Sequence, residues 1–162
     1  DYASNLYFSD GAVELAVNLM KSGRGFTIVT DTNMALAGVN KAALKQLNGT
    51  VRCFMADPDV AAEAKERGVT RAIVSMERAA TLAGPVIFAI GNAPTALIRL
   101  YEMMQKGEIH PDFIIGTPVG FVNVVESKEL ICQSSVPCIV ARGRKGGSNI
   151  AACICNALIY ML

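Results

Sequence analysis

The sequence predicts an α/β fold with three layers, α/β/α, in which helices cover both faces of a mainly parallel, Rossmann-like sheet of five strands. Three apolar runs support this prediction: Pro85 to Ile90, Phe113 to Gly116 and Pro137 to Ala141. Each run ends in a loop rich in glycine or proline and is followed by a helical pattern. Strands without polar alternation are typical of parallel sheets buried on both faces. Because such strands end at one edge, where open α/β sheets bind ligands, we expect a small-molecule site there.

The first third of the chain predicts two helices and two strands. Ser9 is expected to cap a helix that Gly23 ends. The first strand is Phe26 to Thr30. A helix and a turn over residues 41–49 precede the second strand, Val51 to Met55.

The rest of the chain alternates helices with the three apolar runs. Pro58 lies at an early position of a helix. After that helix ends, apolar residues recur with helical spacing over residues 72–82, which predicts a further helix. Asn92 is expected to cap the helix that follows the third strand. The final helix is predicted over residues 149–162.

Composition argues against several classes of protein. The formal net charge of +1 gives no general attraction for nucleic acid. The apolar runs near the end are too short to span a bilayer, and no charged-then-apolar leader is visible, so we expect no membrane partner. The five cysteines lack C-x-x-C spacing and are interpreted as reduced thiols of a cytoplasmic protein. No Cys or His cluster has metal-ligand spacing, and without internal linkers residues 1–162 are predicted to form a single domain.

The best candidate for an anion site is the basic, glycine-rich segment from Arg142 to Ser148. Glycines expose backbone N–H groups, the next helix adds the positive end of its dipole, and Arg142 and Arg144 can bind carboxylates at two points. The alternative is a solvated basic turn in which Ser148 caps the helix. The usual nucleotide motifs, G-x-x-x-x-G-K-[ST] and G-x-G-x-x-G after the first strand, are absent.

Polar residues in the other loops have structural alternatives. A capping role for Asn92 would leave its amide and Thr95 free to face a ligand, and Asp31 is either a cap or a ligand contact. For Glu126 to Lys128 the alternative is a surface ion pair. The single histidine, His110, lies in a helix-to-strand loop at the opposite edge, so no Ser-His-Asp set can be built.

These loops resemble the motifs of the precorrin-8X methylmutase (precorrin isomerase) family. The matching segments are Ala89 to Leu97, Gly116 to Val122 with Glu126 to Lys128, Arg142 to Ser148, Asp31 to Met34, and Thr70-Arg71. The resemblance covers essentially the whole chain and implies an α/β homodimer with sites near the subunit interface. It also implies an isomerase of cobalamin biosynthesis that needs no external cofactor. Its substrate would be precorrin-8X or cobalt-precorrin-8, in which a methyl group moves between neighbouring ring C carbons to give hydrogenobyrinic acid or cobyrinic acid.

The resemblance further implies roles for individual residues. Arg71 would be a charged catalytic group near the reacting edge of the ring. Pro118 to Phe121 would pack against the flat face of the macrocycle, and the Arg142 to Ser148 segment would hold peripheral carboxylates. The implied substrate-binding residues are Asp31, Met34, Thr70, Asn92, Thr95, Pro118, Val119, Gly120, Phe121, Ser127, Lys128, Arg142, Arg144, Gly146, Gly147 and Ser148.

One part of the family pattern is absent from the sequence. The family motif His-x-x-Gly-Asp-x-Asp-Tyr supplies a histidine that is expected to protonate the macrocycle. The chain begins with Asp1-Tyr2, which is similar to the end of that motif, so the histidine is expected in an N-terminal segment missing from this chain. Two interpretations remain open: an isomerase whose turnover is poor without that histidine, or a non-catalytic corrin-binding protein. A nucleotide- or S-adenosylmethionine-binding domain is disfavoured because the first loop lacks the needed glycines.

Overall fold

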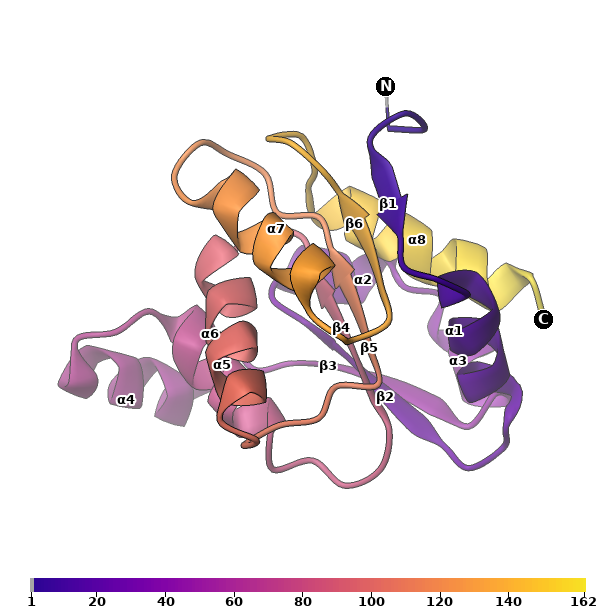
Figure 1. The fold of residues 1–162 in the computed structure, drawn as a ribbon. Coiled ribbons are helices and arrows are strands. Elements are labelled where there is room, and N and C mark those ends of the chain that lie inside the picture. The colour runs from indigo at the N-terminus through magenta and orange to yellow at the C-terminus, as the bar shows by residue number, and fades with distance from the viewer. Residues whose placement is uncertain (1) are drawn as a thin grey trace.

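The computed structural model describes residues 2–162 as a six-stranded sheet between two layers of helices (Figure 1). The strand order is β1-β6-β5-β4-β2-β3, and all neighbours are parallel except β1 with β6. The strands are β1 Leu6–Phe8, β2 Phe26–Thr30, β3 Gly49–Cys53, β4 Val86–Ile90, β5 Phe113–Gly116 and β6 Cys138–Ala141. The helices are α1 Ala12–Lys21, α2 Asn33–Gly38, α3 Lys41–Gln46, α4 Pro58–Arg67, α5 Arg71–Ala79, α6 Pro94–Gln105, α7 Val124–Gln133 and α8 Ser148–Tyr160.

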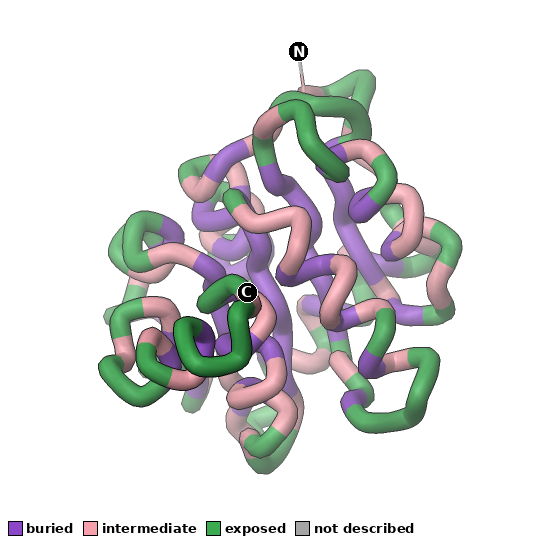
Figure 2. Tube along the Cα trace, turned by 90° about the vertical axis from the view of Figure 1, so that its left-hand side faces the viewer, coloured by how far each residue is buried: buried purple, intermediate pink, exposed green. Residues whose placement is uncertain are grey.

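The sheet separates two hydrophobic cores. Helices α4, α5, α6 and α7 pack on one face, and α1, α2, α3 and α8 cover the other. Every residue of β4, β5 and β6 is buried, and Figure 2 shows these strands inside a shell of more exposed helices and loops. Burial on both faces explains the uninterrupted apolar runs and confirms the three-layer α/β prediction.

The prediction of five strands was wrong by one. β1 is only three residues long and pairs antiparallel with β6 at the sheet edge. The helix cap predicted at Ser9 was also wrong, because the Ser9 hydroxyl accepts a hydrogen bond from the Cys138 N–H at 2.8 Å. Gly11, in the left-handed conformation, precedes α1 instead. The second predicted strand begins earlier than expected, at Gly49.

The topology places a switch point between β2 and β4. From β2 the chain moves outward to β3, whereas from β4 it moves the other way to β5 and then β6. Ligand sites of open α/β sheets lie outside the carboxyl ends of the strands at such a point. In residues 2–162 no helix combines the length and apolar character needed to cross a bilayer.

Candidate functional site

The loops that follow β4, β5 and β6 form one connected layer at the carboxyl edge of the sheet (Figure 1). The Thr117 N–H donates to the Ile90 carbonyl at 2.7 Å, and the Gly147 N–H donates to the Thr117 carbonyl at 2.8 Å. The Thr117 hydroxyl also lies within hydrogen-bond distance of the Ile90 and Gly147 carbonyls. Thr117 therefore joins the three loops, a role that its place in the motif alone does not reveal.

Two glycines are required by close contacts between these loops. A Cβ atom at Gly91 would lie 2.6 Å from the Ser148 Cα. A Cβ atom at Gly146 would lie 2.1 Å from the Thr117 carbonyl oxygen. Neither distance is compatible with a side chain, so the glycines allow the loops to pack backbone against backbone.

Asp31 anchors the loop after β4 instead of facing a ligand. Its side chain is fully buried, and its carboxylate accepts backbone hydrogen bonds from Gly91, Asn92 and Ala93 at 2.8, 2.9 and 2.7 Å. Burial raises the pKa of the Asp31 carboxyl, and the three backbone N–H groups oppose that rise. A direct substrate contact by Asp31 is therefore not possible in this conformation.

The prediction that Asn92 caps α6 was wrong. Ala93 occupies the N-cap position, and no side chain caps the helix there. The N–H groups of the preceding loop are satisfied by Asp31 instead. Asn92 is exposed at the site edge.

The beginnings of α5 and α6 bring together the residues expected near the reacting edge of the ring. Thr70 caps α5 by accepting from the Ile73 N–H at 3.3 Å, and its hydroxyl lies 3.4 Å from the Thr95 hydroxyl. Arg71 is the first residue of α5 and is exposed to solvent. Thr70, Arg71 and Thr95 thus form one polar group at the carboxyl edge.

The loop between β5 and α7 presents an apolar surface next to a cation. Phe121 is 81% exposed, and Val119 and Val122 are exposed too, whereas Pro118 is buried. The Arg144 guanidinium carbon lies 5.9 Å from the centre of the Phe121 ring. Gly120 adopts a φ of 133°, a region that favours glycine, and its N–H donates to the Arg144 carbonyl at 3.2 Å.

Arg142 is not the free carboxylate ligand that the sequence suggested. Its Nε and Nη2 atoms donate to the two carboxylate oxygens of Glu129 at 3.1 and 3.3 Å. Its guanidinium also lies 4.7 Å from the centre of the Tyr7 ring, in β1. Arg142 therefore ties β1 and α7 to the end of β6, and Arg144 is the arginine of this loop that lies beside the exposed apolar surface.

Ser127 and Lys128 are fully buried, so neither the surface ion pair nor a direct ligand contact is correct for them. The Ser127 hydroxyl donates to the Val124 carbonyl at 2.9 Å. The Lys128 ammonium donates to the carbonyls of Gly143 and Lys145 at 2.7 and 2.9 Å. Burial lowers the pKa of Lys128 from 10.5 to about 8.

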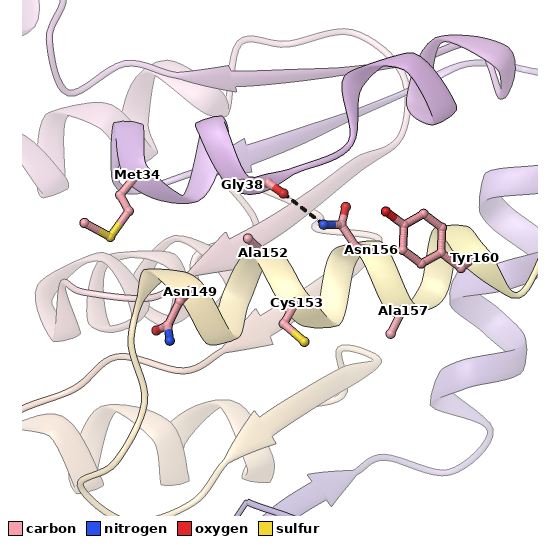
Figure 3. A pocket seen from close by; sticks show the side chains of 8 residues that line it. All are labelled: Met34, Gly38, Asn149, Ala152, Cys153, Asn156, Ala157 and Tyr160. Carbon is pink, nitrogen blue, oxygen red and sulfur yellow. Dashed lines mark hydrogen bonds between the residues drawn. The ribbon is translucent and has the colours of Figure 1, made fainter.

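At the start of α8, Gly147 occupies the N-cap position, so the predicted alternative of a Ser148 cap was wrong. The Ser148 hydroxyl instead lies 2.7 Å from the Thr32 hydroxyl and joins α8 to α2. Met34, 70% exposed in α2, lines one end of a hollow of about 530 Å³ between α2 and α8 (Figure 3). Asn149 lines the same end, and Tyr160 lies at the other (Figure 3).

Two further residues lie at opposite edges of the sheet. His110 is exposed in the loop before β5, at the amino edge, as predicted from its position between helix and strand. Tyr2, which follows the undescribed Asp1, places its hydroxyl 3.5 Å from the Gly146 carbonyl. The start of the described chain therefore lies beside the loop after β6. The resemblance of Asp1-Tyr2 to the end of the family motif involves Asp1, which lies outside the described residues.

The arrangement suits a flat, apolar ligand with negative groups at its rim. An exposed aromatic side chain offers a stacking surface, and Arg144, Arg71 and the N-terminus of α8 offer positive charge. Because His110 is the only histidine of the chain, no histidine acid or base is present at this edge.

Comparison with known proteins agrees with this geometry. The family model described as CbiC, precorrin-8X methylmutase, matches residues 1–161. The chain is 42% identical to the cobalt-precorrin-8 methylmutase of Salmonella typhimurium, with 100% of this chain and 75% of the relative covered. It is also 42% identical to the precorrin-8X methylmutase of Pseudomonas aeruginosa, over 98% of this chain and 76% of the relative. The crystal structure of the precorrin-8X methylmutase from Thermus thermophilus superposes with a TM-score of 0.87 at 36% identity, covering 99% of this chain and 77% of that one. The chain therefore belongs to the precorrin-8X methylmutase family, whose members are isomerases of cobalamin biosynthesis.

Proposed function

We propose that this chain binds precorrin-8X or cobalt-precorrin-8 across the carboxyl edge of the sheet and serves the methyl shift at ring C. The observation that carries the proposal is the exposed Phe121 beside Arg144, on loops that Thr117 joins to the start of α8. A corrin precursor has flat apolar faces and carboxylates around its rim. An aromatic surface flanked by a guanidinium and backbone N–H groups matches both features.

The residues divide into two groups in this proposal. Phe121 and Val119 contact the face of the macrocycle, and Arg144 and the N–H groups at the start of α8 bind peripheral carboxylates. On the other side of the switch point, Arg71 lies near the reacting carbon atoms, with the hydroxyls of Thr70 and Thr95 beside it.

The reaction requires no external cofactor. The carbon–methyl bond breaks at one ring carbon as the new bond forms at its neighbour, so no atom or electron is gained or lost. The task of the protein is to hold the ring in one orientation and to stabilise the charge that develops in it. Protonation of the ring would assist the shift, and His110, at the amino edge of the sheet, is not placed to supply that proton. The alternative, a purely corrin-binding protein, is disfavoured by the methylmutase relatives.

We also propose that the protein is a cytoplasmic homodimer. The exposed side chains of Met34, in α2, and of Tyr160, at the end of α8, lie at the two ends of the hollow in Figure 3. Exposed apolar surface of this kind is typical of protein interfaces. The five cysteines are free thiols, which favours a reducing compartment.

The proposal is tested by titrating the protein with hydrogenobyrinic acid and by following precorrin-8X anaerobically, both by absorbance. We expect saturable binding of the product and slow conversion of the substrate. Arg71→Ala is expected to reduce conversion at least tenfold, whereas Arg24→Ala, at the amino edge of β2, leaves it unchanged. Absence of saturable binding would overturn the proposal, and conversion that is insensitive to Arg71→Ala would remove this residue from the mechanism.

A further inference from the structure

Lys128 is a buried cation that holds an exposed loop from below. It lies on α7 with none of its surface accessible to solvent. Its ammonium donates to the carbonyls of Gly143 and Lys145, which are 15 and 17 residues away in sequence. Residues 142–145 are themselves exposed. One buried side chain therefore holds two carbonyls of a loop that otherwise faces solvent.

The two hydrogen bonds also orient the N–H groups of the loop. In a planar trans peptide, the carbonyl of one residue and the N–H of the next point in opposite directions. Because the carbonyls of Gly143 and Lys145 point toward Lys128, the N–H groups of Arg144 and Gly146 point away from it. Within residues 2–162 neither N–H donates to another group. The Arg144 carbonyl, between them, accepts from the Gly120 N–H and so links this loop to the Phe121 loop.

We infer that Lys128 is a positioning residue, which fixes these peptides so that the N–H groups of Arg144 and Gly146 receive a carboxylate of the corrin substrate. The inference rests on the proposed function, because it names the support of the same site. Lys128 does not touch the ligand. It acts by preorganising the donors, which lowers the entropy lost when the ligand binds.

Within residues 2–162, the structure shows no carboxylate paired with Lys128. Glu129, its neighbour on α7, is bound by Arg142, and the charged groups of α6, Arg99 and Glu102, form ion pairs with each other and with Glu77. Cys132, on the same helix, is a titratable group whose charge acts on Lys128, and the charged residues Arg144 and Lys145 lie in the loop that Lys128 holds. The carbonyls of Gly143 and Lys145 are therefore the main partners of the ammonium.

This environment makes ligand affinity sensitive to pH. With a pKa of about 8, Lys128 loses its charge above that pH, and the charge-assisted bonds to the loop weaken. If only the charged form holds the loop, the apparent affinity falls about tenfold from pH 7 to pH 9. Carboxylates of the ligand are ionised throughout this range. Cys132 also titrates, and burial raises the pKa of its thiol. A Cys132→Ser variant therefore tests whether this thiol, and not Lys128, causes the pH dependence of ligand affinity.

The experiment measures the dissociation constant of hydrogenobyrinic acid between pH 6.5 and 9.5. The proteins are the wild type, Lys128→Met, Cys132→Ser and Lys106→Met, the last a matched change at an exposed lysine after α6. We expect the wild type and the two control variants to lose affinity about tenfold by pH 9. Lys128→Met is expected to bind at least tenfold more weakly at pH 7 and to show no such pH dependence. Amide hydrogen exchange of residues 143–147 should be faster in Lys128→Met.

The outcomes separate this inference from the proposed function. A Lys128→Met protein that binds as tightly as the wild type at pH 7 overturns the inference. A pH profile that disappears in Cys132→Ser does the same. Should Lys128→Met fail to fold, the pH dependence of the dissociation constant in the wild type and in Cys132→Ser decides: a loss of affinity of about tenfold by pH 9 in both supports the inference, and no loss in the wild type overturns it. If the wild type does not bind the corrin, the proposed function fails, whereas exchange in the loop still reports whether Lys128 holds it.

Discussion

Replacing Asp31 by asparagine tests whether one buried carboxylate holds the loop after β4. One Asp31 oxygen accepts from the Gly91 N–H, and the other accepts from the N–H groups of Asn92 and Ala93. Asparagine has the same shape but replaces one oxygen by an NH₂ group. In either orientation of the amide, at least one backbone N–H then faces a donor and is left without an acceptor.

The expected loss of stability follows from these bonds. A buried N–H without an acceptor costs about 1–3 kcal/mol, and hydrogen bonds to a neutral oxygen are weaker than those to a carboxylate. The variant in turn avoids burying a charge, a cost reflected in the raised pKa of Asp31. We therefore expect a net loss of about 2 kcal/mol, which lowers the melting temperature of a chain of this size by about 4–8 °C.

The assay is thermal unfolding followed by circular dichroism at pH 7. Asp112→Asn is the matched control, because the exposed Asp112 accepts a single backbone bond, from Val86, that an asparagine oxygen can also accept. Its melting temperature should change by less than about 2 °C. If Asp31→Asn melts within 1 °C of the wild type, about the resolution of such an assay, Asp31 does not anchor the loop and the account of this edge is wrong.

Three other changes have defined outcomes. Gly146→Ala places a methyl group 2.1 Å from the Thr117 oxygen and should lower corrin affinity. It should also lower the unfolding free energy, measured by denaturant titration, by about 1–3 kcal/mol. Gly116→Ala is the control, and because its nearest contact would be 3.4 Å it should lower the unfolding free energy less. Arg144→Met should weaken binding of hydrogenobyrinic acid about tenfold or more. Arg142→Met should change the affinity little and the unfolding free energy by less than about 1 kcal/mol. A larger loss of affinity in Arg142→Met than in Arg144→Met would refute the assignment of ligand binding to Arg144. For Lys128, the pKa is about 8 in the folded state and 10.5 in the unfolded state, so the unfolded state binds more protons between these values. Stability relative to Lys128→Met should therefore rise by about 3 kcal/mol as pH increases through this window, and a fall measured by urea denaturation would contradict the burial of the charge.

The fold was predictable because the strong signals in the sequence arise from burial. The runs that became β4, β5 and β6 contain no charged residue, since both faces of each strand are covered by helices. β1 was missed because three residues that pair at a sheet edge are too few to show a hydrophobic pattern. For the same reason the sequence did not indicate that Ser9 bonds to β6.

The site was predictable as a set of loops but not residue by residue. Asp31 and Arg142 both follow buried strands, and nothing local distinguishes a ligand contact from a bond to Gly91 or Glu129. Partners so distant in sequence depend on how the strands are ordered, which the sequence pattern does not determine.

Lys128 did carry a local signal. The buried residues of α7 are Val124, Ser127, Lys128 and Ile131, which is the i, i+3, i+4, i+7 spacing of a helix face directed at a core. A lysine at such a position is expected to be buried with hydrogen-bond partners, whereas Glu126 lies off this face and is exposed.

The most direct test of the central claim is a crystal structure of the protein with hydrogenobyrinic acid. We predict that the macrocycle lies against Phe121, with a peripheral carboxylate within hydrogen-bond distance of Arg144 or of the Gly146 N–H, and with Arg71 beside the ring. A macrocycle bound away from these loops, for example wholly within the hollow between α2 and α8, would contradict the assignment of the site to the carboxyl edge of the sheet.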